Sequence, residues 1–475
     1  MKKEKELVKN TFIILFGKLC TQFLSFLLLP LYTSVLEPSE YGVADLITTY
    51  VALIIPVITL QLEMALFREL IDVRNNKSKQ REIVTSGIFG IIFNLLISII
   101  IISIVNIFIS IPFKLYIILT VASSIFSNLL LQIARGRGDN VGYSVGSMVA
   151  AVSTIGCNIL FLVILNFKIE GLLLSTALGN LLASIFMFFR CKIYDLINFK
   201  YISKKQLKLL LKYSIPLVPN GLIWWIINVS DRTLITLFIG TASNGIYAVA
   251  NKFSNILIQL FNVFNLSWTE SASLHIGADD KNNFFSRIFN AIIKLFASIC
   301  IMLICTMFIL FPIIINKEFN EAYIYIPLLL IGMFFNVIVS FIGSVYIALK
   351  KTREVAKTSL YASILNIIIN VLLINKIGIY AAAISTIVAF LIMSIYRYLD
   401  IQKYVILKIE CKTIVELIII FIISITVYYI NNIFVSILSL IIIMLYLIYI
   451  NKNILLKIAE KLLKKYNFKR KNNVL

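Results

Sequence analysis

Long apolar runs, separated by short polar segments, recur along almost the whole chain. Most are near the length of about 20 residues that a helix needs to cross a hydrocarbon layer roughly 30 Å thick. They lack the period-two alternation of a membrane β-barrel, so the pattern predicts an all-α polytopic membrane protein. Fourteen spans are expected, at residues 8–36, 41–67, 82–108, 113–134, 140–166, 170–190, 212–239, 243–270, 285–315, 323–349, 354–375, 379–398, 413–431 and 433–451.

The basic residues indicate how these spans are oriented. Of the 475 residues, 60% are hydrophobic and 14% are charged, and most of the 44 Lys and Arg residues lie on alternate connecting segments, beginning with "MKKEKELVK". Such a bias places the basic segments and both termini in the cytoplasm. The net charge of +21 therefore indicates topology and contact with anionic membrane lipid, and no nucleic-acid partner is expected. The opposite segments carry only Lys114, Lys168, Lys317 and Lys376.

Few residues are suited to metal binding or catalysis. The six cysteines show no C-x-x-C spacing and are expected to be free thiols, and His275 is the single histidine. No Walker lysine motif is present, which argues against ATP as the direct energy source. The apolar run of residues 12–36 is longer than the core of a signal peptide and is expected to be the first span. We expect no metal, no cofactor and no enzymatic activity.

A weak internal repeat relates the two halves of the chain. The segment "LEPSEYGVAD" (36–45) aligns with "IGTASNGIYA" (239–248), which places Gly42 opposite Gly245. At nearly the same offset, "QIARGRGD" (132–139) aligns with "YIALKKTR" (346–353), and "EGLLLST" (170–176) with "YAAAIST" (380–386). Three matches in the same order predict that spans 1–6 and 7–12 are two copies of one six-helix unit with pseudo-two-fold symmetry.

The repeat suggests a division of the chain into four parts. Residues 1–190 form an N-terminal six-helix bundle, and 191–211 form an amphipathic linker that is expected to lie as a helix on the inner leaflet. Residues 212–400 form the second bundle. Residues 401–475 add two further spans and a basic cytoplasmic tail. Spans 3, 13 and 14 are nearly all apolar and are expected to face lipid.

Polar residues follow one face of the first two spans of each copy. On span 2, Asp45 and Glu63 are eighteen residues apart, which is five helical turns and predicts a shared direction. Span 8 repeats the pattern with asparagines that include Asn251 and Asn255, and span 7 carries Asn228. These faces predict a water-filled cavity between the bundles. The alternative is that Asn and Thr side chains only bond neighbouring helices together.

The most unusual polar stretch is "NVSDRTLI" at 228–235. Ionisable side chains inside a membrane cost free energy and commonly mark functional sites. Asp231 and Arg232 differ by about 100° in direction, so they cannot both face one partner squarely. Arg232 is suited to phosphate, although it could instead pair within the bundle or extend to the outer surface. Lys294 and Glu270, near inner ends, could simply mark the interface.

Two sets of candidate residues follow from these patterns. An anionic substrate is expected to contact Lys18, Arg232, Lys252, Asn228, Asn251 and Asn255. A coupling cation, H⁺ or Na⁺, is expected at one or more of Asp45, Glu63 and Asp231.

Several stretches of the sequence resemble a known family. They are "FLLLPLYTSVLEPSEYGVADL" (26–46), "KYSIPLVPNGLIWWIINVSDRTLITLFIGTASNGIYAVANKF" (212–253), "FNLSWTE" (264–270) and "YIAL" (346–349). Together they are similar to polysaccharide-biosynthesis flippases of the multidrug/oligosaccharidyl-lipid/polysaccharide exporter superfamily, which includes translocases of O-antigen and capsule repeat units. The resemblance covers residues 8–400.

The resemblance implies an activity and a set of partners. The expected protein lies in a bacterial cytoplasmic membrane and exports undecaprenyl-diphosphate-linked oligosaccharides by alternating access, with polysaccharide polymerase and glycosyltransferases as candidate neighbours. The cationic central cavity of the family corresponds to Lys18, Arg232 and Lys252. Two alternatives remain open: a cation-coupled multidrug exporter of the same superfamily, and a membrane scaffold for polysaccharide assembly enzymes that transports nothing.

Overall fold

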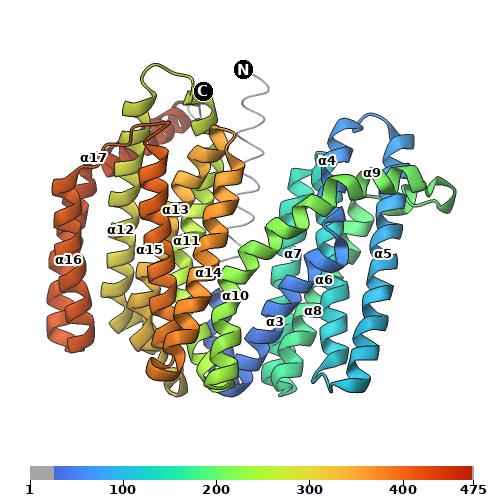
Figure 1. Ribbon diagram of the computed structural model, residues 1–475, viewed down its shortest axis with the longest axis horizontal. Coiled ribbons are helices and arrows are strands. Elements are labelled where there is room, and N and C mark those ends of the chain that lie inside the picture. The colour runs from blue at the N-terminus through green and yellow to red at the C-terminus, as the bar shows by residue number, and fades with distance from the viewer. Residues whose placement is uncertain (1–25, 473–475) are drawn as a thin grey trace. The chain divides into compact units, whose positions relative to one another are not determined.

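The computed structural model describes residues 26–472, although the side chains of residues 220–228, 266 and 453–472 lie outside the description. Every regular element in this range is helical (Figure 1). The α-helices are α2 Leu29–Val35, α3 Pro38–Thr59, α4 Leu62–Asp72, α5 Lys77–Phe108, α6 Lys114–Gly136, α7 Asn140–Asn158, α8 Lys168–Arg190, α9 Lys204–Ser214, α10 Val218–Phe238, α11 Thr241–His275, α12 Lys281–Ile314, α13 Ala322–Ala348, α14 Thr352–Ile377, α15 Tyr380–Ile401, α16 Cys411–Ile430 and α17 Ile433–Asn472.

These helices confirm the all-α polytopic fold class. Eleven of the described helices are long and apolar enough to cross a membrane, and they match predicted spans 2–6 and 9–14. The helices α10 and α11 cover the seventh and eighth predicted spans. Most of the first predicted span lies outside the described residues. The apolar side chains of α5, α16 and α17 are mostly exposed, in agreement with their expected contact with lipid.

The chain divides into two compact units. Unit 1 is Met1–Val249, Glu318–Asn320 and Asn366–Ala382, and unit 2 is Ala250–Lys317, Glu321–Leu365 and Ala383–Leu475. Unit 1 thus contains α10 and the first residues of α11, in addition to α2–α9. The division into bundles at residues 190 and 212 stays a prediction. Within unit 1, α10 packs against α3.

Unit 1 is built on the packing of α6, α7 and α8, with α4 against α6. Buried Leu, Ile and Ala side chains fill the core, among them Leu66, Ile125 and Ile133. Polar groups in this core are bonded to backbone, as where the Thr120 hydroxyl donates to the carbonyl oxygen of Leu173 on the neighbouring helix, at 3.2 Å. This bond follows the rule that buried polar groups take hydrogen-bond partners.

The second predicted span is not one continuous helix. It ends as α3 at Thr59 and restarts as α4 at Leu62, because Leu60 and Gln61 adopt left-handed backbone angles with φ of 49° and 58°. Such angles are unfavourable for residues other than glycine. The prediction that Asp45 and Glu63 share one direction was therefore wrong in its premise, since five regular turns do not connect them.

The linker is only partly helical. Residues 191–211 were expected to form one interfacial helix, but the structure shows two short 3₁₀ turns, Ile193–Asp195 and Phe199–Tyr201, before α9 begins at Lys204. The Ser203 hydroxyl caps α9 by accepting a hydrogen bond from the backbone N–H of Gln206. The amphipathic α9 lies against α4 and α5 (Figure 1). The loop before α9 is anchored to α5 by two hydrogen bonds. The backbone amides of Asn198 and Ser203 donate to the hydroxyls of Thr85 and Ser86, respectively.

A reciprocal glycine contact supports the internal repeat. A Cβ atom on Gly42 would overlap the carbonyl oxygen of Thr241, and a Cβ atom on Gly245 would overlap the carbonyl oxygen of Pro38. Each glycine thus lies against the residue four positions before the other, as a local two-fold relation requires. The Asn244 amide also donates to the carbonyl oxygen of Gly42 at 2.8 Å. The two positions that align in the sequence repeat meet in space.

Unit 2 has an aromatic core. Trp268 stacks on Phe341 with ring centroids 4.5 Å apart, and its indole nitrogen donates to the Phe341 carbonyl oxygen. The Phe285 ring packs edge-on against Trp268, and the Phe289 ring packs at a tilt against Phe341. The helices α16 and α17 contact α12. These contacts tie the two additional C-terminal spans to α12, the ninth predicted span.

We predict opposite effects for the same substitution at two helical glycines. Gly42→Ala should lower the melting temperature of the detergent-solubilised protein, because its Cβ atom meets backbone and overpacking typically costs about 1–3 kcal/mol. Gly156→Ala should leave the melting temperature unchanged or raise it, because an added Cβ atom would meet nothing within 4 Å beyond the nearby backbone of its own helix, and alanine favours helix over glycine. Equal melting temperatures for the two variants would contradict the close crossing at Gly42.

Candidate functional site

A buried ion pair joins α3 to α10. The Arg232 Nε atom lies 2.7 Å from an Asp45 carboxylate oxygen, and the two side chains are only 13% and 9% exposed. Both residues belong to unit 1, where α3 and α10 lie side by side (Figure 1). A pair so removed from water needs close geometry, because each charge loses much of its hydration. Arg232 therefore has a definite partner and does not extend to the surface.

The position of Asp45 follows from how α3 begins. Pro38 occupies the first turn, and Glu37 and Glu40 form a reciprocal capping box at its N-terminus. Glu40 also pairs with Lys168 at the start of α8. Gly42, one turn further, allows close approach of the backbone of α11, so the next turn places Asp45 at the α10 contact. The capping box and Gly42 thus fix the position of the Asp45 carboxylate along the axis of α3.

The α3–α10 contact continues beyond the ion pair. The Tyr50 and Thr233 hydroxyls lie 3.0 Å apart, and Thr233 also donates to the Val229 carbonyl oxygen. Tyr41 is 3% exposed. It lies close enough to interact electrostatically with both Asp45 and Arg232. The pair is therefore enclosed by aromatic side chains and hydroxyl groups that exclude bulk water.

Asp231 faces a different set of partners. It is 3% exposed, and its carboxylate accepts hydrogen bonds from the Asn370 amide at 2.8 Å and the Tyr247 hydroxyl at 3.1 Å. One residue earlier, the Ser230 hydroxyl donates to Asn366 Oδ1 at 3.2 Å. The helix α10 thus presents Arg232 towards α3 and Asp231 towards α14 and α11, as the 100° rotation between neighbours requires.

The donors to Asp231 differ from those of Asp45. An amide and a hydroxyl are neutral groups, so these two hydrogen bonds stabilise the carboxylate without neutralising its charge. The Asn370 Oδ1 atom is also buried and accepts no hydrogen bond. A carboxylate beside a free amide oxygen resembles the oxygen-rich surroundings that hard cations prefer. Among the described residues, no group of three or more His, Cys, Asp or Glu side chains could hold a metal ion.

The remaining predicted residues lie in three places. Lys18 lies outside the described residues, as does the side chain of Asn228. Glu63 lies in the first turn of α4, and one of its carboxylate oxygens is buried without a hydrogen-bond partner. The part of α11 in unit 2 carries Asn251, Lys252 and Asn255. Asn251 is buried and accepts a hydrogen bond from Ser254. Their contact with a substrate stays a prediction.

Sequence reasoning missed three residues of this site. Asn366 and Asn370 are four positions apart in the apolar run "ASILNIIINVLL", a spacing that places two amides on one helix face. That signal was available. Tyr247 gave none, because tyrosine is common at membrane boundaries.

Arg397 was also missed as a buried charge. It lies one turn before the end of α15, is 2% exposed, and donates to the carbonyl oxygens of Val339 and Val355 and to the hydroxyls of Thr358 and Ser359. These contacts bind α13, α14 and α15 of unit 2 together, so Arg397 has a structural role. Lys294, considered an interface marker, pairs with Glu410 at 2.7 Å.

Comparison with known proteins decides the family. A sequence-family model described as "Polysaccharide biosynthesis protein" matches residues 7–268, more than half of the chain. The chain belongs to this family. A search of curated protein sequences gave no significant match. The polysaccharide biosynthesis family assignment agrees with the resemblance found in the sequence.

Solved structures of low sequence identity share the fold. The lipid II flippase MurJ in an inward closed conformation gives a TM-score of 0.69 at 17% identity, covering 94% of this chain and 100% of that chain. An inward-facing MATE family multidrug transporter of the MOP superfamily gives 0.66 at 13% identity, covering 82% and 98%. A MOP superfamily transporter from Pyrococcus furiosus gives 0.54 at 12% identity, covering 83% and 95%. This member of the polysaccharide biosynthesis family has the MOP transporter fold.

We predict strong energetic coupling between Asp45 and Arg232. Asp45→Asn and Arg232→Gln should each destabilise the protein by roughly 3–5 kcal/mol, because each leaves a buried charge without its partner. The double variant should be less destabilised than the sum of the two. Unfolding free energies in detergent for the full double-mutant cycle provide the measurement.

The exposed pair of Arg68 and Asp72 on α4 is the matched control. Its side chains are 47% and 59% exposed, so solvent screens their interaction and the same cycle should give a coupling energy below about 1 kcal/mol. Additive effects at Asp45 and Arg232 would mean that the two charges are solvated separately.

Proposed function

We propose that the protein is a flippase that moves polyprenyl-diphosphate-linked oligosaccharide units across the cytoplasmic membrane by alternating access. The observation that carries the proposal is the buried pair of Arg232 and Asp45 on two helices beside the reciprocal glycine contact. Membership in the polysaccharide biosynthesis family supports a glycan precursor as the substrate. Transport involves no catalytic step, and polymerase and glycosyltransferases are the expected neighbours in the same assembly route.

The chemistry of Arg232 suits a diphosphate. A guanidinium group stays charged and offers a planar set of N–H donors that fits phosphate oxygens. Inside a membrane it needs an anionic partner, because leaving it without one would cost several kcal/mol. Asp45 supplies that partner when no substrate is present. A diphosphate could take the place of the carboxylate, so that Arg232 exchanges one anion for another and is never left unpaired.

The location of the pair suggests what this exchange does. If the N-terminus is cytoplasmic, the start of α3 and the end of α10 face outside, and Asp45 and Arg232 lie about two turns from those ends. The ion pair then closes the outer side. Substrate binding to Arg232 would weaken this closure by competing for the guanidinium group. Release of the substrate outside would allow Asp45 to re-form the pair and reset the transporter.

Asp231 is the best candidate for coupling to a cation gradient. It lies next to Arg232 on α10, so a change in its charge alters the electrostatics of the neighbouring guanidinium group. Its buried carboxylate is supported by Asn370 and Tyr247, which are neutral. Binding of H⁺ or Na⁺ would neutralise that charge. Asp45 and Glu63 remain the other candidates.

We predict that the purified protein in liposomes moves a fluorescent polyprenyl-diphosphate-linked oligosaccharide between leaflets. Arg232→Gln should reduce the initial rate by about one to two orders of magnitude, since a lost charge-assisted contact to phosphate removes roughly 1.5–3 kcal/mol. Arg68→Gln, on the exposed face of α4, should transport at the wild-type rate. The measurement is the fraction of label accessible to a membrane-impermeant quencher over time.

The same liposomes separate the alternatives. Movement of a cationic dye without movement of the lipid-linked sugar would identify a multidrug exporter. Absence of both activities, from protein that remains folded and correctly oriented, would favour a scaffold for assembly enzymes. Either result would overturn the flippase proposal.

We predict that Asp231→Asn uncouples transport from the cation gradient. The variant should transport at a rate that no longer responds to an imposed H⁺ or Na⁺ gradient, because an amide neither ionises nor carries the charge that attracts a cation. The double exchange of Asp231→Asn with Asn370→Asp should retain a response, since it moves the single carboxylate only to the hydrogen-bonded neighbouring position. An unaltered response to both gradients in Asp231→Asn would exclude this residue as the coupling site.

A further inference from the structure

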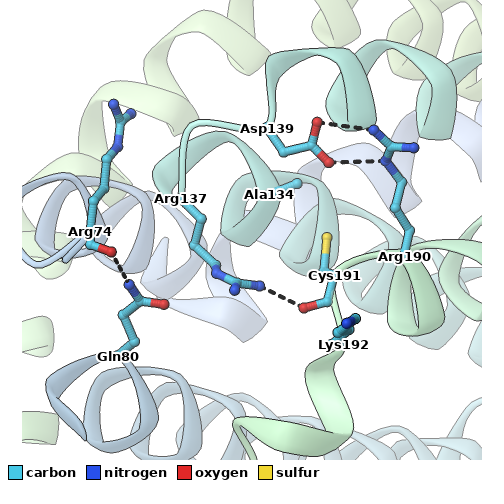
Figure 2. A pocket seen from close by; sticks show the side chains of 8 residues that line it. All are labelled: Arg74, Gln80, Ala134, Arg137, Asp139, Arg190, Cys191 and Lys192. Carbon is cyan, nitrogen blue, oxygen red and sulfur yellow. Dashed lines mark hydrogen bonds and ion pairs between the residues drawn. The ribbon is translucent and has the colours of Figure 1, made fainter. Parts of the chain in front are cut away.

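A polar pocket of about 270 Å³ lies at one end of unit 1, apart from the Asp45–Arg232 site. It forms where the ends of α4, α6 and α8 come together with the loops that follow them (Figure 2). The side chains that line it include Arg74, Gln80, Arg137, Asp139, Arg190 and Lys192.

The pocket has an excess of positive charge. Four cationic side chains and one carboxylate line it, which leaves three positive charges in excess. The carboxylate of Asp139 is already occupied, since it accepts two hydrogen bonds from Arg190 at 2.9 and 3.1 Å and one from the Gly142 amide at 2.7 Å. Figure 2 shows the paired contact between Asp139 and Arg190 at one side of the pocket.

Asp139 keeps its charge near neutral pH. Partial burial raises the pKa of the Asp139 carboxyl, but the hydrogen bonds from Arg190 and the Gly142 amide outweigh this effect. The net pKa therefore lies below the ordinary value of an aspartic acid. Arg190 and Asp139 stay charged and matched, and the positive charges of Arg74, Arg137 and Lys192 remain for another anion.

Backbone contacts hold two of these cations in place. Arg74 Nε donates to the Gly136 carbonyl oxygen at 2.8 Å, and Arg137 donates to the Cys191 carbonyl oxygen at 2.6 Å. Gly138, with φ of 92°, lets the loop turn beneath the Arg74 guanidinium group, which lies 3.4 Å from where a Cβ atom would stand. Only one or two donors of each arginine are used in these bonds. The remaining donors are pre-positioned rather than free to rotate.

The surroundings of the pocket are those of a membrane surface. It lies at the ends of the apolar spans α6 and α8, and the nearby Phe189 and Tyr194 are 64% and 51% exposed. Exposed aromatic residues at span ends are typical of the interface between hydrocarbon and headgroups. The basic loops at this end are also those assigned to the cytoplasmic side, where anionic lipids lie.

We propose that this pocket binds a phosphate group at the cytoplasmic membrane surface, supplied by the headgroup of an anionic phospholipid. Arg74, Arg137 and Lys192 line one cavity, whereas Lys200 on the following loop is exposed and does not line it. General attraction between basic loops and anionic membranes does not require a shared cavity. The site is independent of the transport activity proposed above, because it lies on other residues and needs no substrate movement.

The test compares lipid binding by variants of the purified full-length chain. Short-chain phosphatidylglycerol should raise the melting temperature of the wild-type protein in a saturable manner, and phosphatidylcholine should not. Lys192→Gln and Arg74→Gln should each weaken the apparent affinity roughly tenfold, as expected for loss of one charge-assisted contact. Lys200→Gln removes the same charge from the neighbouring loop and should bind like wild type.

A second set of measurements identifies the source of the phosphate group. Inorganic pyrophosphate is added in place of lipid. If it stabilises the protein as well as phosphatidylglycerol and loses its effect in the Lys192 variant, the site binds the phosphate group itself and needs no lipid. Lys192→Gln is the decisive variant, because it removes only an exposed ammonium group and leaves the Arg74 hydrogen bond intact. Equal binding of phosphatidylglycerol by wild type and this variant would overturn the proposal, as would equal stabilisation by the two lipids with no effect of pyrophosphate.

Discussion

A guanidinium group buried inside a membrane protein must have an anionic partner, and this requirement governs the structure around Arg232. Its partner Asp45 lies 2.7 Å away on another helix, so α3 and α10 have to meet at a defined height. The neighbouring crossing of α3 with α11, the helix that follows α10, is close because Gly42 and Gly245 have no Cβ atoms to separate the backbones. The capping box of α3 then sets the register. An anion that competes for Arg232 acts on this helix contact directly, so binding of a phosphate-bearing substrate is linked to an opening movement.

The membrane architecture could be predicted from sequence because hydropathy and charge are local properties. The membrane spans and the basic segments could be recognised directly in the sequence. The alignment of Gly42 with Gly245 also predicted two positions that meet in the structure. The break at Leu60 and Gln61 could not be predicted in the same way, because neither is a residue that favours left-handed angles. The polar face inferred for span 2 failed because it assumed an unbroken helix.

The pairing within the site depended on information that the sequence does not contain. Asp45, Asp231 and Arg232 were all recognisable as unusual, but which carboxylate faces the guanidinium group depends on the rotation of α10. One hydrogen-bond partner of Asp231, Asn370, comes from α14, far away in the chain. The basic pocket was hidden for the same reason, since Arg74, Arg137 and Lys192 come from three separate loops. Each loop alone shows only the ordinary positive charge of a cytoplasmic segment.

Transport through an exchange of anions at Arg232 requires α3 and α10 to separate at the ion pair. This separation can be tested with the pair itself left intact, in a background without the six native cysteines, by placing cysteines at Tyr50 and Thr233, whose hydroxyls lie 3.0 Å apart. A short reducible reagent would then link the two helices. We expect movement of the lipid-linked oligosaccharide to stop when the link forms and to resume on reduction, while each single-cysteine variant is unaffected. Transport at the full rate with the link in place would contradict the separation of α3 from α10.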